Sequence, residues 1–293
     1  MIDHKSIVKP KIIKSKKDGT HAVIHFSNMG EMLSCVDQGE YHHKTSRDEE
    51  WTYGRHVVGR DALERALKMG KTSEHLVKQY QKQRAMLEMK AGIKQFTGMG
   101  LSCRRKRAIR DDGDDLSMSR LMGGGDQYWV TTIRESKRAN VRIGMNMAIS
   151  WQHKENDFVR LGATLAVMSD VLTKLGYAVE VIAFNFTAYN GKKNWKYLGM
   201  SIPMKMPNEP LDIHRLLTSG LPGLFRDKCF GLMGKAWDSN STMGYQTPVT
   251  DTYKKELNLL HVVEQEFCKT DEKAVDGLHE MIKGLSDKPV WMR

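Results

Sequence analysis

The sequence predicts an α/β fold, in which a mainly parallel sheet has helices on both faces and follows a smaller, mostly helical α+β region. Three consecutive segments carry this prediction. Residues 139–150 (ANVRIGMNMAIS) form an apolar run with polar flanks, which is typical of a strand buried on both faces. Residues 157–176 have large apolar residues at helical spacing and end in a glycine. Residues 177–186 (YAVEVIAFNF) are β-branched and apolar, as expected for a second buried strand.

Strand, helix and strand in this order form a βαβ unit, whose crossover makes the two strands parallel and the connection right-handed. A third strand is predicted over 195–206, followed by a helix that begins near Asp212. Residues 224–237 fit either a strand or a helix, because periodicity does not separate the two in a short apolar run. Residues 251–283 have apolar residues at helical spacing and predict a helical segment near the end of the chain.

The first half of the chain contains shorter patterns. Residues 1–20 hold six lysines and predict either a basic arm or an edge strand. A β-branched run at 21–26 leads into a helix for which Ser27 is the candidate N-cap. Two further helices are predicted, over 59–70 and over about 72–95.

Residues 102–127 differ in composition from both flanks: five basic residues are followed by four aspartates and then by three consecutive glycines. Such a change is typical of a hinge. We therefore expect a basic, mostly helical α+β region over 1–110, a linker over 111–127 and an α/β domain over 128–293.

The formal net charge of +11 and a pI near 9.4 favour polyanionic partners, such as nucleic acid or an acidic protein face. No run of about 18 apolar residues predicts a membrane span, and the amino-terminal segment has no signal-peptide pattern. The four cysteines are far apart and form no C-x-x-C pair, as expected for reduced thiols. We therefore expect a cytoplasmic protein without a membrane partner.

The order of the predicted elements and several short motifs resemble von Willebrand factor A-type (VWA-like) domains of uncharacterised phage and prophage proteins. The motifs are NMAIS at the end of the first strand, the helix in RLGATLAVMSDVLTKLGYAVEV, and PLDIHRLLTSGLPGLFRD. The first half, with FSNMGEMLSCVD, RDALERALKMG and GGGD, is similar to the region that precedes the domain in those proteins. The resemblance covers most of the chain. It implies a Rossmann-type sheet, a protein-binding role, an AAA+ ATPase as the class of partner, and the host cytoplasm if the chain is viral.

VWA domains that bind metal have Asp-x-Ser-x-Ser at the carboxyl end of the first strand, where hard oxygen ligands hold Mg²⁺. The matching positions in this chain are Asn146, Ala148 and Ser150. An amide replaces the carboxylate and an alanine replaces a hydroxyl, so the resemblance implies a defective metal site. We expect no metal site and no cofactor, and tight Mg²⁺ binding is not expected.

The end of this strand is still the favoured contact surface, because loops and helix amino termini converge there in open parallel sheets. The candidate partner-binding residues are Asn146, Ser150, Trp151 and His153. The competing interpretation is structural: the asparagine and serine satisfy backbone groups, the tryptophan belongs to the core, and the histidine is an exposed loop residue.

Sequence motifs of the common enzyme classes are missing. The chain has no G-x-x-x-x-G-K-[ST] phosphate loop, no G-x-S-x-G nucleophile elbow and no H-E-x-x-H zinc motif. We therefore expect a binding protein with no catalytic residues, and not an enzyme.

Two binding functions remain open. The first is a phage-type VWA-like adaptor that acts through protein–protein interaction. The alternative is a nucleic-acid-binding factor in viral transcription or replication, in which lysine and arginine side chains contact phosphates. Its candidate residues are Lys14, Lys16, Lys17, Arg104, Arg105, Lys106, Arg107 and Arg110. For the arginine cluster, the competing interpretation is charge neutralisation by the aspartates at 111–115.

Overall fold

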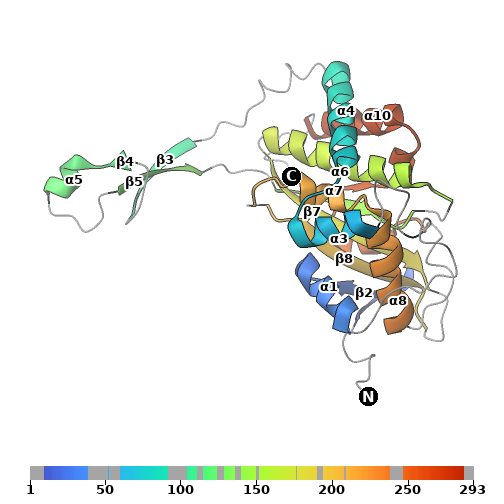
Figure 1. The fold of residues 1–293 in the computed structure, drawn as a ribbon. Helices are drawn as coiled ribbons and strands as arrows, with labels where there is room; N and C mark the ends of the chain where they lie inside the picture. Colours follow the sequence, from blue (N-terminus) through green and yellow to red (C-terminus); the bar gives the residue numbers. More distant parts are fainter. Residues whose placement is uncertain are drawn as a thin grey trace.

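A computed structural model describes most of the chain (Figure 1). The described residues are 10–38, 52, 60–91, 104–110, 115–123, 129–135, 140–149, 152–175, 177–189, 194–207, 209–237 and 247–286. Within them, a six-stranded sheet has the strand order β1-β2-β8-β7-β6-β9, and a separate three-stranded sheet has the order β3-β5-β4. The chain therefore has a mixed α/β architecture.

The βαβ unit predicted from the sequence is confirmed. β6 (Asn140–Asn146) is followed by α6 (Glu155–Lys174) and then by β7 (Ala178–Ala188), which pairs with β6 in parallel. The burial pattern of β6 follows from its apolar sequence, since nearly all of its residues are covered. At the start of α6, Asp157 accepts a hydrogen bond from the backbone N–H of Lys154 at 3.1 Å, which satisfies a group that the helix leaves unpaired.

β8 (Tyr197–Lys205) confirms the third predicted strand but runs antiparallel to β7. The segment 189–196 that joins the two is shorter than the dozen or so residues that a parallel crossover needs. The sheet is consequently mixed, with three parallel pairs among its five neighbouring strand pairs.

β9 (His261–Val263) corrects the sequence analysis, which predicted helical structure throughout 251–283. This three-residue strand pairs in parallel with β6 and forms one edge of the sheet. The sequence pattern predicts a helix there because two helices, α9 (Asp251–Glu256) and α10 (Asp271–Ser286), lie on either side of the strand. The short 3-10 helix η6 (Gln265–Cys268) follows the strand directly.

The N-terminal region contributes the other edge of the same sheet. β1 (Lys11–Ser15) and β2 (Gly19–His25) form a hairpin, and β2 pairs in parallel with β8. Of the two structures predicted for residues 1–20, the edge strand is therefore the one found over the described part. The division into 1–110, 111–127 and 128–293 stays a prediction, although residues from both halves share one sheet and one hydrophobic core.

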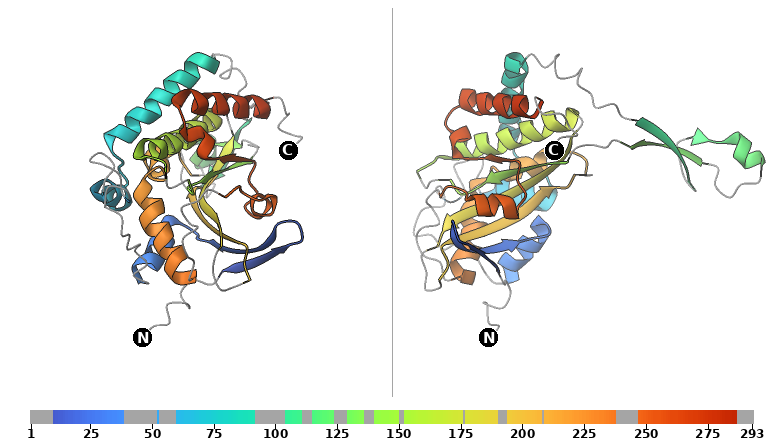
Figure 2. Two further views of the ribbon diagram at one scale, coloured as in Figure 1. Left: turned by 90° about the vertical axis from the view of Figure 1, so that its right-hand side faces the viewer. Right: turned by 180° about the vertical axis from the view of Figure 1, so that it is seen from behind.

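Three helices of the first half follow the predicted pattern. α1 (Met29–Gln38) begins after Asn28, whose side chain accepts a hydrogen bond from the backbone N–H of Glu31 at 2.9 Å, so Asn28 caps the helix in place of Ser27. α3 (Arg60–Met69) ends at Gly70, which has a φ of 65°. α4 (Glu74–Ala91) packs against α6 and α10 (Figure 2).

The segment between β8 and β9 is mainly helical. α7 (Ile213–Thr218) starts at Asp212, which caps it by accepting from the backbone N–H of Arg215 at 3.1 Å. Residues 224–237, left open by the sequence, form the π-helix η4 (Leu224–Cys229) and then α8 (Phe230–Trp237). Among the described helices, none is both long and apolar enough to cross a membrane.

Two groups of apolar side chains hold the layers together. The larger group joins one face of the sheet to helices from both halves of the chain. The smaller group lies on the other face, where Tyr253 of α9 stacks on Phe186 with ring centroids 4.7 Å apart. The two faces follow from strand alternation: Phe184 and Phe186 point to α9, and Val181 and Ala183 point to the larger group.

The second sheet is built from residues 104–135. β3 (Arg104–Arg110) pairs antiparallel with β5 (Trp129–Glu135), and the two-residue strand β4 (Asp115–Leu116) pairs with the other side of β5. α5 (Met118–Met122) lies between β4 and β5 in the chain. Figures 1 and 2 show this small sheet standing away from the six-stranded sheet.

Candidate functional site

The strongest candidate site lies where β6 and β9 end side by side. β6 has β7 as its neighbour on one side and β9 on the other. The connection from β6 leads to β7, and β9 joins the opposite edge of β6 later in the chain, so the strand order reverses between β6 and β9. In open α/β sheets, ligands bind outside the carboxyl ends of the strands at such a point. We call residues 146–149, 152–154 and 264–266 the rim, since they follow these two strand ends.

The rim begins with Asn146, the first predicted partner-binding residue. Its side chain is buried, and Oδ1 accepts a hydrogen bond from the backbone N–H of Ala148 at 3.0 Å. Met147 donates its backbone N–H to the carbonyl of Phe184 at 2.7 Å, which extends the pairing with β7 by one step. The asparagine therefore shapes the turn after β6, and its role in partner binding stays a prediction.

The donor set at this strand end does not fit the magnesium site of metal-binding VWA domains. Asn146 uses its carboxamide oxygen within the turn, and Ala148 offers no ligand. Among the described residues, no group of three or more His, Cys, Asp or Glu side chains is arranged to hold a metal ion. Ser150 and Trp151, the other predicted residues of this loop, lie outside the described residues.

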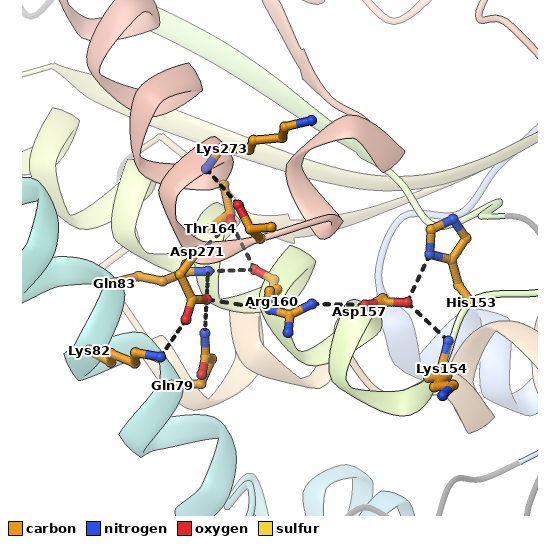
Figure 3. A network of polar contacts seen from close by, with 11 residues as sticks. Gln79, Lys82, Gln83, His153, Lys154, Asp157, Arg160, Thr164, Asp271 and Lys273 are labelled. Atoms are coloured by element: carbon orange, nitrogen blue, oxygen red, sulfur yellow. Dashed lines mark hydrogen bonds and ion pairs between the residues drawn. The ribbon is translucent and has the colours of Figure 1, made fainter.

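His153, the fourth predicted residue, belongs to a network of polar side chains at the start of α6 (Figure 3). Its Nδ1 lies 2.9 Å from Oδ2 of Asp157, whose other oxygen accepts a hydrogen bond from Arg160 at 2.8 Å. The backbone carbonyl of His153 accepts from the buried guanidinium of Arg226 at 2.8 Å, which ties the loop to η4. The histidine is therefore held in place and is not a free loop residue.

The network continues to Asp271 at the start of α10. Arg160 lies 3.5 Å from this carboxylate, which also accepts a hydrogen bond from Lys82 of α4 at 2.6 Å. Burial by itself raises the pKa of Asp271, but the hydrogen bonds from Lys82, Gln83 and Gln79 outweigh it and hold the pKa below its usual value. The amino ends of α6 and α10 are thus joined by alternating charges next to the rim (Figure 3).

Glu264 is a rim residue that the sequence analysis did not find. It directly follows β9, and because Met145 pairs with Val263 in parallel, Glu264 is the in-register neighbour of Asn146. Burial raises the pKa of this carboxyl, and Glu266 raises it further, while Lys254 opposes the shift. The sequence signal was present, as an acid after the β-branched run HVV, but the helical interpretation of this segment concealed it.

Residues 6–285 match a protein family described as a domain of unknown function, DUF7192. The chain belongs to this family. No curated protein and no solved structure matches it.

A second residue absent from the sequence analysis, Asn185, lies near the rim of this DUF7192 chain. It follows Phe184 in β7 and is fully buried, and neither its amide nitrogen nor its carbonyl oxygen has a hydrogen-bond partner among the described residues. A buried carboxamide without hydrogen-bond partners lowers the stability of the folded protein. The presence of Asn185 at this position is therefore not explained by stability. The signal in the sequence was a single amide within the apolar strand AFNF.

The basic residues predicted to contact nucleic acid fall into two separate groups. Lys14, Lys16 and Lys17 are exposed on the β1–β2 hairpin, where Lys17 forms an ion pair with Asp251 at 2.7 Å. The five basic residues of the second group all lie on β3, in the three-stranded sheet: Arg104, Arg105, Lys106, Arg107 and Arg110. The two groups therefore belong to different sheets.

Proposed function

We propose that this DUF7192 protein is a VWA-like binding protein, which docks a partner protein on the rim and acts as an adaptor without catalysis. The phage-type origin and the AAA+ ATPase as a partner class come from the sequence resemblance and are part of the proposal. The single observation that carries it is the register of β6 and β9, which makes Asn146 and Glu264 neighbours at the reversal point of the sheet.

The chemistry of the rim favours a polar protein surface as its partner. Gln152, Lys154 and Glu266 are exposed residues of the rim and offer an amide, an ammonium and a carboxylate. The half-buried Glu264 adds a hydrogen-bond acceptor. A hydrogen-bond donor from a partner would offset the free-energy cost of burying its carboxylate. Charged groups around such a contact set the specificity and the rate of association more than the affinity.

The proposal also assigns a role to the network behind the rim. Asp157, Arg160 and Asp271 link three helices through charge-assisted hydrogen bonds and ion pairs, and so hold the exposed residues on a rigid support. A preorganised surface loses less conformational entropy on binding than a flexible loop does. Binding through this surface requires no metal ion, since the ligand set for magnesium is incomplete at Asn146 and Ala148.

The test is affinity capture from lysate of the source cells with the full chain, repeated with the double variant Lys154→Glu, Glu266→Lys. We expect one stoichiometric protein with the wild type and at least a tenfold loss of it with the variant, because both exposed charges are reversed while the net charge is kept. Addition of EDTA should leave capture unchanged.

The matched control is Lys71→Glu, Glu280→Lys, which makes the same charge exchange at exposed positions outside the rim. This control should capture the partner as well as the wild type does. Equal capture by the rim variant and the control would contradict the proposal, and so would a partner that EDTA releases.

A further inference from the structure

The second sheet presents a long and regular basic ribbon. β3 and β5 pair through seven consecutive positions, from Arg104 opposite Glu135 to Arg110 opposite Trp129, without a bulge. At about 3.4 Å per residue, such a ribbon is roughly 24 Å long. Among the described residues, no strand pairs with the outer edge of β3, and β4 pairs only with the first two positions of β5, Trp129 and Val130.

Positive charge is concentrated on one strand of this ribbon. Five of the seven residues of β3 are arginine or lysine, and none is acidic. Successive positions of a strand belong to opposite faces, so Arg104, Lys106 and Arg110 are positions of one face and Arg105 and Arg107 are positions of the other. Both faces of the ribbon therefore carry basic positions.

The strand order separates this charge from Asp115, one of the four aspartates that follow it in the sequence. Asp115, the described member of that run, is paired with Val130 in β4. The order β3-β5-β4 places β5 between β4 and β3, so the two backbones are about 10 Å apart. This distance argues against the competing interpretation, in which the aspartate neutralises the basic residues of β3.

We infer that the β3–β5 ribbon binds double-stranded DNA by entering its major groove. The major groove of B-form DNA, about 12 Å wide, admits a two-stranded β-ribbon, and rows of phosphates border it on both sides. Basic positions on both faces of the ribbon match those two rows. The inference does not depend on the function proposed for the rim.

Other occupants match this distribution less well. A second copy of the chain that paired along the free edge of β3 would bring arginine next to arginine, which is unfavourable. An acidic peptide that paired there would follow one edge and leave the basic positions on the two faces without a common partner. The major groove of an RNA duplex is deep and narrow, and it does not admit side chains in the same way.

The test uses the full chain and fluorescence anisotropy with a labelled 30-base-pair DNA duplex over a range of salt concentrations. We expect binding that weakens steeply with salt, with a log–log slope of about −0.9 for each phosphate contacted. The variant Arg105→Gln, Arg107→Gln should bind at least tenfold more weakly and reduce the magnitude of that slope by about 2, since two phosphate contacts are lost.

The matched control is Lys68→Gln, Lys71→Gln, which removes the same charge at exposed positions near the end of α3. It should bind as the wild type does, and both variants should unfold at the wild-type temperature. The rim variant Lys154→Glu, Glu266→Lys should also bind DNA normally, which separates this test from that of the adaptor function.

Four outcomes would overturn the inference: no DNA binding at low salt, equal weakening by the α3 control, tighter binding to single-stranded DNA or to an RNA duplex of the same sequence, or binding to anionic phosphatidylserine vesicles in place of DNA. The vesicle arm is included because Met118, Leu121 and Met122 of α5 are exposed close to the ribbon in the chain.

Discussion

Gly162 of α6 and Gly220, which follows α7, pack backbone against backbone. A Cβ atom added to Gly162 would lie 2.7 Å from the Cα of Gly220, and one added to Gly220 would lie 2.9 Å from the Cα of Gly162. Two backbones have to part if either position carries a side chain. This contact sets how closely the helix of the βαβ unit approaches the segment that leads into η4.

The variant Gly162→Ala is therefore expected to destabilise the protein by about 1–3 kcal/mol, the usual cost of an extra carbon in a packed interior. Alanine favours the helix intrinsically, so a loss of stability would show that the close contact outweighs helix propensity. The measurement is urea denaturation of the full chain. The exposed Asn156→Ala, on the same helix, is the control and should change the free energy of unfolding by less than about 0.5 kcal/mol. Equal stability of Gly162→Ala and the wild type would show that the two backbones are free to separate.

Tyr80 donates its hydroxyl hydrogen to the buried carboxylate of Asp170 at 3.0 Å, and this bond joins α4 to α6. The variant Tyr80→Phe should lower the free energy of unfolding by about 1–3 kcal/mol, since hydrogen bonds to buried charged groups are worth about that much. The control is Lys174→Ala, which removes the ion pair between a half-exposed lysine and the same carboxylate and should cost at most about 1 kcal/mol. A larger loss for Lys174→Ala than for Tyr80→Phe would contradict the assignment of the buried bond as the stronger link.

Asp271 should make the free energy of unfolding decrease at acidic pH. Its pKa is lowered in the folded protein, so its contribution to stability is present above the unfolded pKa, near 3.9, and is lost as the pH falls through the folded value. The variant Asp271→Asn should thus be less stable than the wild type at pH 7, by about 1–3 kcal/mol, and the two should converge below about pH 4. Denaturation curves across this range give the comparison. The exposed Asp276→Asn should show no such convergence, because it starts close to the wild type.

Glu264 should act in the opposite direction. Because its pKa is raised on folding, its favourable contribution is complete below the unfolded pKa, near 4.3, and is lost as the pH rises through the folded value. The variant Glu264→Gln is therefore expected to be more stable than the wild type at pH 7 and equal to it near pH 4. Thermal unfolding at several pH values measures this difference, with the exposed Glu280→Gln as a control that should not gain stability with pH. A gain confined to Glu264 would be consistent with a carboxylate kept for binding at a cost in stability.

The elements that repeat a local pattern could be predicted from the sequence. Four elements lie close to their predicted positions: the crossover helix α6 and the strands β6, β7 and β8. Their burial requires apolar residues at regular spacing or in an unbroken run, and such patterns are visible in the sequence. The three-residue β9 left no such record between two helices. The capping residue of α1 was placed one position too early, since serine and asparagine are comparable N-caps and the backbone decides between them.

For the candidate site, the sequence located the end of β6 but not what lies beside it. Asn146 and His153 were found because they follow a predicted strand. Glu264 was not found, since its place at the rim depends on the pairing of β9 with β6, a strand more than a hundred residues away in the sequence. The basic cluster at 104–110 was recognised as a charge run, yet nothing in its composition indicated a seven-residue strand in a separate sheet.

The sequence by itself determined most of the buried and helical segments of this protein and where the positive charge lies along the chain. Only the tertiary structure decided that β2 joins β8, that β9 joins β6, and that Asp115 stands across β5 from the basic strand. The reason is physical. Strands pair through backbone N–H and C=O groups, which are alike in almost every residue. The pattern of side chains therefore predicts which residues are buried but not which strand lies next to which.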